Sequence, residues 1–159
     1  MRLTIVAVGR LRTGPERELS DRYRKRLDQL AGVTGITLTV REVAESRKQR
    51  TQDRREEEGR LIGAAVPGGA LTVALDAGGT QLDSEALAGR LADWRDRAAG
   101  DAAFVMGGAD GLSPSVVGGA KLVLSLGKLT WPHQLARVML TEQLYRAMTI
   151  LAGHPYHRA

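Results

Sequence analysis

The sequence predicts a single α/β domain in which helices flank a mostly parallel sheet. Short apolar runs with β-branched residues recur along the chain, and most are followed by a longer stretch with apolar residues at helical spacing. Such alternation favours parallel strands joined by helical crossovers. The 159 residues are enough for one domain with a sizeable core, and 43% of them are apolar, which excludes a disordered chain. We therefore interpret residues 1–159 as one domain.

Each expected element has its own local signal. Strands are expected where apolar or alternating runs occur, at residues 3–8, 36–40, 71–75, 102–106 and 122–126. Helices are expected at residues 15–30, in the segment that ends at 66, at 84–99, from 114, and at 132–151. Pro15 and Pro114 suit the first turn of a helix, Ser113 suits an N-cap, and Gly153 stops the last helix.

Composition excludes several classes of function. The chain has no cysteine, which excludes disulfides, thiolate zinc sites and the cysteine-dependent route to methylation at C5 of a pyrimidine. His133, His154 and His157 have no cluster of carboxylates near them, so no metal is expected. The sequence shows neither a signal peptide nor an apolar run that could span a membrane, so we expect a cytoplasmic protein without a membrane partner.

Charge leaves two interpretations open. The net charge of +5 fits an anionic partner such as a nucleic acid, and it equally fits an ordinary basic surface. The most basic stretch lies within residues 45–60, where a loop is expected to run into a helix. Its basic residues are Arg47, Lys48, Arg50, Arg54 and Arg55. The alternative is a solvated helix with internal ion pairs, because Glu56, Glu57 and Glu58 follow in the same stretch.

Unusual residues follow three of the expected strands. Leu75–Asp76 ends one strand, residues 107–111 (Gly-Gly-Ala-Asp-Gly) follow the next, and residues 126–132 follow the last. Ligands in open α/β sheets bind beyond the carboxyl ends of the strands, and glycines let the backbone approach a ligand closely. Apolar walls for an adenine ring could come from Leu75, Leu126, Leu129 and Trp131. The alternative is that these glycines only make tight turns; the first strand is not followed by a dinucleotide-binding glycine pattern.

The last expected helix is apolar over most of its circumference, apart from a narrow strip formed by Glu142, Tyr145, Arg146 and Thr149. Glu142 and Arg146 are spaced to pair, either as a structural ion pair or as a substrate contact. Because one small domain should not cover so much apolar surface, we expect this helix to pack against a second subunit. The tail 154–158 adds aromatic, imidazole and guanidinium groups of the kind that stack on bases and bind phosphates.

Four motifs, together with residues 3–9, closely resemble the RlmH (YbeA) family of SPOUT-class methyltransferases. They are Phe104–Leu112, Leu124–His133, Glu142–Ala147 and His154–Arg158, in the order and spacing of that family, and the resemblance covers the whole chain. It implies an α/β domain with a C-terminal trefoil knot, an exception to the rarity of knots. It also implies a homodimer that uses S-adenosylmethionine to methylate N3 of a pseudouridine in 23S ribosomal RNA, on the large subunit or the assembled ribosome.

The resemblance also implies which residues form the site. The cofactor residues would be Leu75, Gly107, Leu126, Gly127, Lys128, Leu129, Thr130 and Trp131, with Gly127 where the family often has serine. The candidates for proton transfer and for binding phosphate or the substrate oxygen are His133, Glu142, Arg146, Tyr156, His157 and Arg158, and the sequence does not select the base among them. Two alternatives are a related enzyme that methylates a ribose 2′-oxygen and a non-catalytic ribosome-assembly factor.

Overall fold

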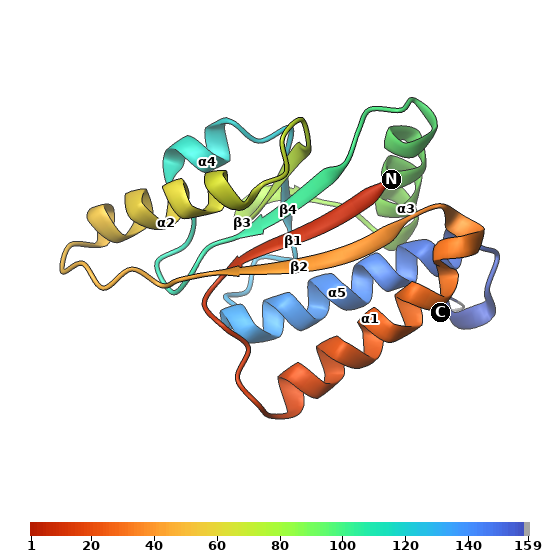
Figure 1. The fold of residues 1–159 in the computed structure, drawn as a ribbon, viewed down its shortest axis with the longest axis horizontal. Helices are drawn as coiled ribbons and strands as arrows, with labels where there is room; N and C mark the ends of the chain where they lie inside the picture. The colour runs from red at the N-terminus through yellow and green to blue at the C-terminus, as the bar shows by residue number, and fades with distance from the viewer. Residues whose placement is uncertain (158–159) are drawn as a thin grey trace.

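The computed structural model describes residues 1–157 and contains a five-stranded sheet between two layers of helices (Figure 1). The strands are β1 (Arg2–Val8), β2 (Thr37–Val43), β3 (Leu71–Gln81), β4 (Ala102–Met106) and β5 (Leu122–Ser125), in the spatial order β2-β1-β4-β3-β5. Every pairing in this sheet is parallel, so the carboxyl ends of the strands lie at one edge. The predicted α/β class is confirmed, whereas the trefoil knot stays a prediction.

The helices divide between the two faces of the sheet (Figure 1). The larger apolar core lies where α1 (Pro15–Thr34), α3 (Ser84–Asp96) and α5 (His133–Leu151) pack together on one face. The smaller core lies beneath α2 (Thr51–Ala65) and α4 (Pro114–Gly118) on the other face. A short 3-10 helix, Pro155–His157, follows α5. Ser113 caps α4 as predicted, because its side chain accepts a hydrogen bond from the Val116 amide. None of the helices in residues 1–157 is both long and apolar enough to cross a membrane.

Strand β3 is longer than the sequence suggests. The apolar run ends at Leu75, but the strand continues past a register shift to Gln81 and keeps pairing with β5. Gly79 explains this, because a β-carbon there would lie 2.7 Å from the carbonyl carbon and oxygen of Val123. Gly79 therefore allows the backbones of β3 and β5 to approach each other closely.

The expectation that α5 has too much apolar surface for one domain is wrong for most of the helix. Its residues Leu140, Leu144, Ala147 and Met148 are fully buried, because α5 lies between α1 and α3 of the same chain. Leu135 is the exception, with 41% of its surface exposed. Burial of α5 therefore gives no reason by itself to expect a second subunit.

A buried guanidinium fixes the N-terminal half of α5 against the sheet. Arg137 has a side chain that is only 2% exposed and lies 2.7 Å from the Glu42 carboxylate of β2. It also donates hydrogen bonds to the carbonyls of Val8 and Gly9, at 3.1 and 2.9 Å. Burial lowers the pKa of Arg137, and the neighbouring Glu42 opposes that shift. The contact joins α5 to the carboxyl ends of β1 and β2.

We predict that Arg137→Met lowers the free energy of unfolding by about 2–4 kcal/mol, because it removes the donor to two buried carbonyls and the cation paired with Glu42, whose carboxylate keeps only the hydrogen bond from the Leu11 amide. Urea unfolding at fixed protein concentration measures this. The control is Arg97→Met, which removes an exposed guanidinium that pairs with Asp93 and should change stability by less than about 0.5 kcal/mol. Equal stability of the two variants would contradict the role assigned to Arg137.

Candidate functional site

A cavity of about 230 Å³ opens at the carboxyl ends of β3, β4 and β5. This is the edge of a parallel sheet at which ligands bind in α/β proteins. Three segments line it: 75–77 of β3, 106–111 after β4, and 126–131 after β5, and the first turn of α5 closes it. The predicted residues Leu75, Gly107, Leu126, Gly127, Leu129, Thr130, Trp131 and His133 all belong to the lining. Lys128 is exposed and is not part of the lining.

The segment after β4 forms a tight turn that shapes the base of the cavity. The Gly111 amide donates to the carbonyl of Gly108 at 3.1 Å, and Gly111 has a φ of 80°, a conformation that favours glycine. A β-carbon at Gly107 would lie 2.7 Å from the amide nitrogen of Leu112. Gly107 is thus required by the turn itself, which is a different reason from the ligand approach inferred from the sequence.

The segment after β5 is held against the extended part of β3. The Ser125 hydroxyl lies within hydrogen-bond distance of the carbonyls of Ala77 and Gly127, at 3.2 and 3.1 Å, and accepts a hydrogen bond from the Gly127 amide at 3.1 Å. Gly127 has a φ of 118°, and nothing lies within 4 Å of the place where its β-carbon would be. Backbone conformation, rather than lack of space, therefore favours glycine at this position.

The chemistry of the lining fits S-adenosylmethionine. Leu75, Leu126, Leu129 and Trp131 offer apolar walls for an adenine ring, and the glycine-rich turns expose backbone groups that can bind its edge. Asp76 is the only acidic residue that lines the cavity in the described part of the chain. Its carboxylate also accepts a hydrogen bond from the Gly78 amide at 2.8 Å. A carboxylate suits a ligand with a positively charged sulfonium and ammonium group.

A second polar cluster lies at the other end of α5. Arg146 contacts Glu142 at 2.9 Å, and Tyr156 donates a hydrogen bond to the same carboxylate at 3.2 Å. The Tyr156 ring packs on Tyr145, with 4.7 Å between ring centroids, and the Arg146 guanidinium lies 5.1 Å from the centre of the Tyr156 ring. Burial raises the pKa of Tyr156, and Tyr23 and Glu142 add to the shift. Both effects favour the protonated phenol, which donates to Glu142 in this arrangement.

One chain does not bring all the predicted catalytic residues together. His133 lines the cavity, whereas Glu142 and Arg146 lie nine and thirteen residues further along α5. At the rise of an α-helix these separations are about 14 and 20 Å along the axis. Tyr156 belongs to the distant cluster. The His157 side chain and Arg158 lie outside what the structure describes.

Sequence reasoning missed several residues that shape the site. Met106 and Ala136 line the cavity beside the predicted residues, and so do Gly108 and Ala109 of the 107–111 segment, which were not named individually. Met106, Gly108 and Ala109 lie in the 104–112 motif, whereas Ala136 lies outside the four motifs. The buried carboxylate of Glu58 lies next to Gly108, because a β-carbon there would be 3.3 Å from its Oε2. No local pattern distinguishes Glu58 from the two glutamates before it. Among residues 1–157, no three histidine or carboxylate side chains are arranged to hold a metal ion.

Comparison with known proteins gives full-length relatives. Residues 1–157 match the family described as "Predicted SPOUT methyltransferase". A protein of Bradyrhizobium diazoefficiens named "Ribosomal RNA large subunit methyltransferase H" is 54% identical to this chain, and 100% of each chain is covered. A protein of Rhodopseudomonas palustris with the same name is 53% identical, again with 100% of each chain covered.

Solved structures with low sequence identity share the fold. A probable methylase family protein from Haemophilus influenzae superimposes with a TM-score of 0.54 at 12% identity, covering 99% of this chain and 70% of that one. A probable methyltransferase from Bordetella pertussis gives a TM-score of 0.50 at 16% identity, covering 92% of this chain and 95% of that one. Together with the family match over nearly the whole sequence, the parallel sheet and its edge cavity establish that this chain belongs to the SPOUT methyltransferase family.

Proposed function

We propose that this protein transfers a methyl group from S-adenosylmethionine to N3 of a pseudouridine in 23S ribosomal RNA, within the large subunit or the assembled ribosome of the cytoplasm. The observation that carries the proposal is that one cavity is lined by two of the motifs that resemble the RlmH family, residues 104–112 and 124–133. The relatives named as large-subunit methyltransferases support ribosomal RNA as the substrate. The pseudouridine N3 acceptor rests on the motif resemblance.

The lining residues can perform most of what the reaction requires. S-adenosylmethionine supplies a methyl group that is already activated by its sulfonium, so the protein must align the acceptor and exclude water. As the bond from N3 to the methyl carbon forms and the carbon–sulfur bond breaks, the N3 proton must leave. His133 is the only histidine that lines the cavity within residues 1–157, and we assign it the role of accepting that proton.

We further propose that the working enzyme is a homodimer of two single-domain, knotted subunits. Two apolar side chains that line the cavity are exposed, Leu129 by 70% and Trp131 by 39%, and Leu135 in the first turn of α5 is exposed by 41%. A second subunit would cover such side chains. It would also bring its own Glu142, Arg146 and tail toward the cavity, which explains why one chain keeps these groups apart.

Mapping of methyl groups in ribosomal RNA tests the reaction directly. Deletion of the gene should remove one methyl group from N3 of a pseudouridine in 23S ribosomal RNA, and add-back should restore it, as measured by mass spectrometry of RNA fragments. Ribosomes that lack the pseudouridine should be poor substrates, because uridine presents different ring edges. Equal turnover on such ribosomes, or a methyl group on a ribose oxygen, would contradict the proposed acceptor.

Substitution of Gly107 tests the cofactor site. Gly107→Ala places a β-carbon against the Gly111–Leu112 backbone, so the turn must move and S-adenosylmethionine should bind more weakly by about tenfold or more. Calorimetry measures the affinity, and circular dichroism checks the fold. The control is Gly63→Ala, because nothing lies within 4 Å of the added carbon. Undiminished affinity in a folded Gly107 variant would place the cofactor elsewhere.

Removal of residues 156–159 tests whether subunits share sites. The deletion removes the Tyr156 contacts to Tyr145 and Glu142, so cofactor binding should remain and methyl transfer should fall by at least about 100-fold. Heterodimers of this variant with Gly107→Ala should regain activity at one of their two sites. If subunits exchange and no activity returns, each site is built within one chain.

A further inference from the structure

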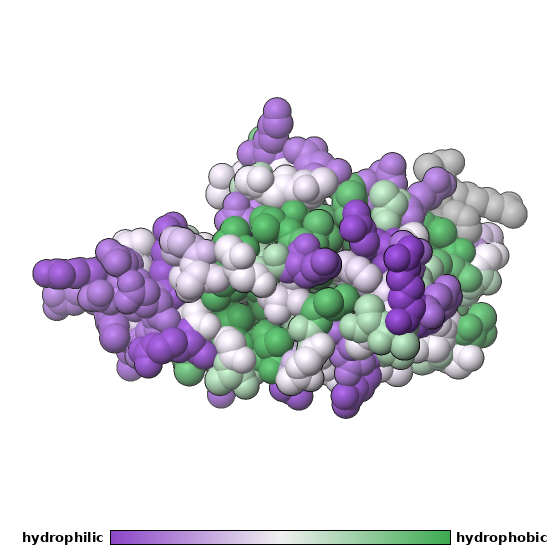
Figure 2. All heavy atoms as spheres, turned by 90° about the horizontal axis from the view of Figure 1, so that it is seen from above, coloured by the Kyte–Doolittle hydropathy of each residue, from purple (hydrophilic) through white to green (hydrophobic). Residues whose placement is uncertain are grey.

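Three cations in the loop before α2 are exposed and unpaired. Arg47, Lys48 and Arg50 are exposed, and no ion pair within residues 1–157 involves them. Asp53 is the only acidic residue among the ten residues 46–55, which include five basic ones. Figure 2 shows hydrophilic residues gathered at this end of the molecule, where Figure 1 places the start of α2. We call residues 47–50 the basic loop.

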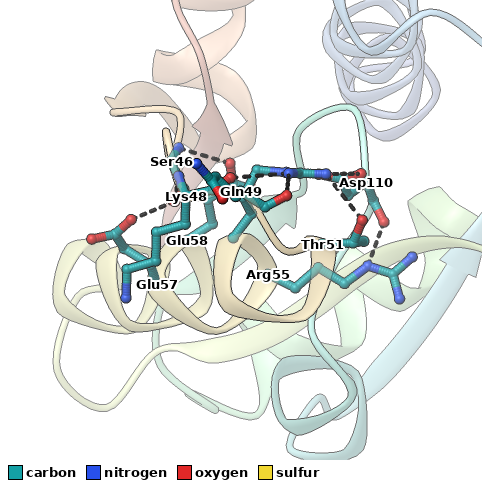
Figure 3. A network of polar contacts seen from close by, with 9 residues as sticks. Ser46, Lys48, Gln49, Thr51, Arg55, Glu57, Glu58 and Asp110 are labelled. Carbon is teal, nitrogen blue, oxygen red and sulfur yellow. Dashed lines mark hydrogen bonds and ion pairs between the residues drawn. The ribbon is translucent and has the colours of Figure 1, made fainter.

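The carboxylates near the basic loop accept hydrogen bonds from uncharged groups, and Figure 3 shows those of Glu57 and Glu58. Glu58 accepts a hydrogen bond from the Ser46 amide at 3.0 Å, and Glu57 accepts one from the Ser46 hydroxyl. Glu56 accepts one from the Gln52 amide group at 3.0 Å. No ion pair within residues 1–157 joins Glu56, Glu57 or Glu58 to the basic residues of the stretch, although the charge of Glu58 contributes to the raised pKa of Arg54. Glu57 and Glu58 bind Ser46 instead. They hold the start of the basic loop and leave its cations free.

Arg54 fixes the backbone of the basic loop and joins it to the cavity. Its guanidinium donates to the carbonyls of Lys48 and Gln49, at 3.0 and 2.7 Å, and contacts the Asp110 carboxylate at 2.6 Å. The Arg54 hydrogen bond holds the pKa of Asp110 below its usual value, so the pair stays charged. Arg55 donates to the Asp110 carbonyl at 2.6 Å, as Figure 3 shows. Since Asp110 lies in the 107–111 turn, the basic loop is fastened to the segment that shapes the cavity.

We propose that the basic loop is a docking surface for the phosphate backbone of the RNA substrate, and that Arg54 holds this surface in register with the cavity. The proposal rests on the proposed function. Contacts to phosphate position a nucleic acid without reading its sequence, and they require free cations at fixed places. Helix α2 adds positive potential beside the basic loop, because its N-terminal end at Thr51 lies there and no side chain caps it.

A charge-removal variant tests the surface. The variant combines Arg47→Gln, Lys48→Gln and Arg50→Gln. Its affinity for protein-free 23S ribosomal RNA should fall on the order of 100-fold at 0.1 M salt. The slope of log affinity against log salt should become shallower by about 2. Filter binding over a salt series measures both. Affinity for S-adenosylmethionine should not change. The apparent KM for ribosomes should rise while kcat at saturation stays the same, because the loop binds RNA and takes no part in the reaction.

A matched control removes three exposed cations from other elements: Arg22 and Lys25 on α1, and Arg90 on α3, each replaced by glutamine. This control should lose little affinity and keep the wild-type salt slope. An equal loss in both variants would show that only net charge matters, and wild-type affinity in the loop variant would show that RNA binds elsewhere. Either result overturns the proposal. If the wild-type protein methylates ribosomes in these assays, the proposed function stands whatever the loop variant does.

The role of Arg54 is tested by Arg54→Lys, which keeps the charge but cannot hold two carbonyls and a carboxylate together. RNA affinity should fall although net charge is unchanged, and the salt slope should fall less than in the triple variant. Unchanged RNA affinity would show that the loop needs no fixed backbone to bind, and would overturn the part assigned to Arg54.

Discussion

Arg137 joins α5 to the carboxyl ends of β1 and β2, at the same edge of the sheet as the cavity. Four residues before it, His133 begins the helix and lines the cavity. The segment 126–132 must therefore connect the end of β5 to a helix whose start is held in place by a buried guanidinium. The shape of the cavity wall follows from these two fixed ends and from the Ser125 contacts between them.

The polar groups of the chain lie in separate places that share few contacts. The cavity suits the cofactor, the Glu142–Arg146–Tyr156 cluster lies at the far end of α5, and the basic loop lies on the opposite layer of helices from α5. In the proposed dimer, one RNA substrate would contact all three groups. The 107–111 turn joins the cofactor cavity to the basic loop through the contact between Arg54 and Asp110.

Much of the fold could be predicted because its signals are local. Apolar runs located all five strands, and proline and serine marked the starts of α1 and α4. Contacts between distant segments could not be predicted in this way. The need for glycine at position 79 is one example, because its close approach to Val123 depends on a strand more than forty positions away. Likewise, α1 and α3 bury the apolar residues of α5, but the spacing of residues within α5 does not show which other helices pack against it.

The candidate site likewise has residues that the sequence predicts and residues that only the structure shows. Glycine and apolar residues after the strands marked the cavity, since parallel strands bring their ends to one edge. The roles of Arg137 and Glu58 were invisible, because a charged residue in a sequence gives no sign that it is buried. The basic stretch was visible, but only the structure shows that Glu57 and Glu58 bind Ser46 rather than its arginines.

Amide hydrogen exchange with and without S-adenosylmethionine measures most directly whether the edge cavity is the cofactor site. Binding should slow exchange in residues 107–111 and 126–131, which line the cavity, and leave α1 and the strand β2 unchanged. Exchange that slows only in other segments, or that does not change at a saturating cofactor concentration, would contradict this assignment.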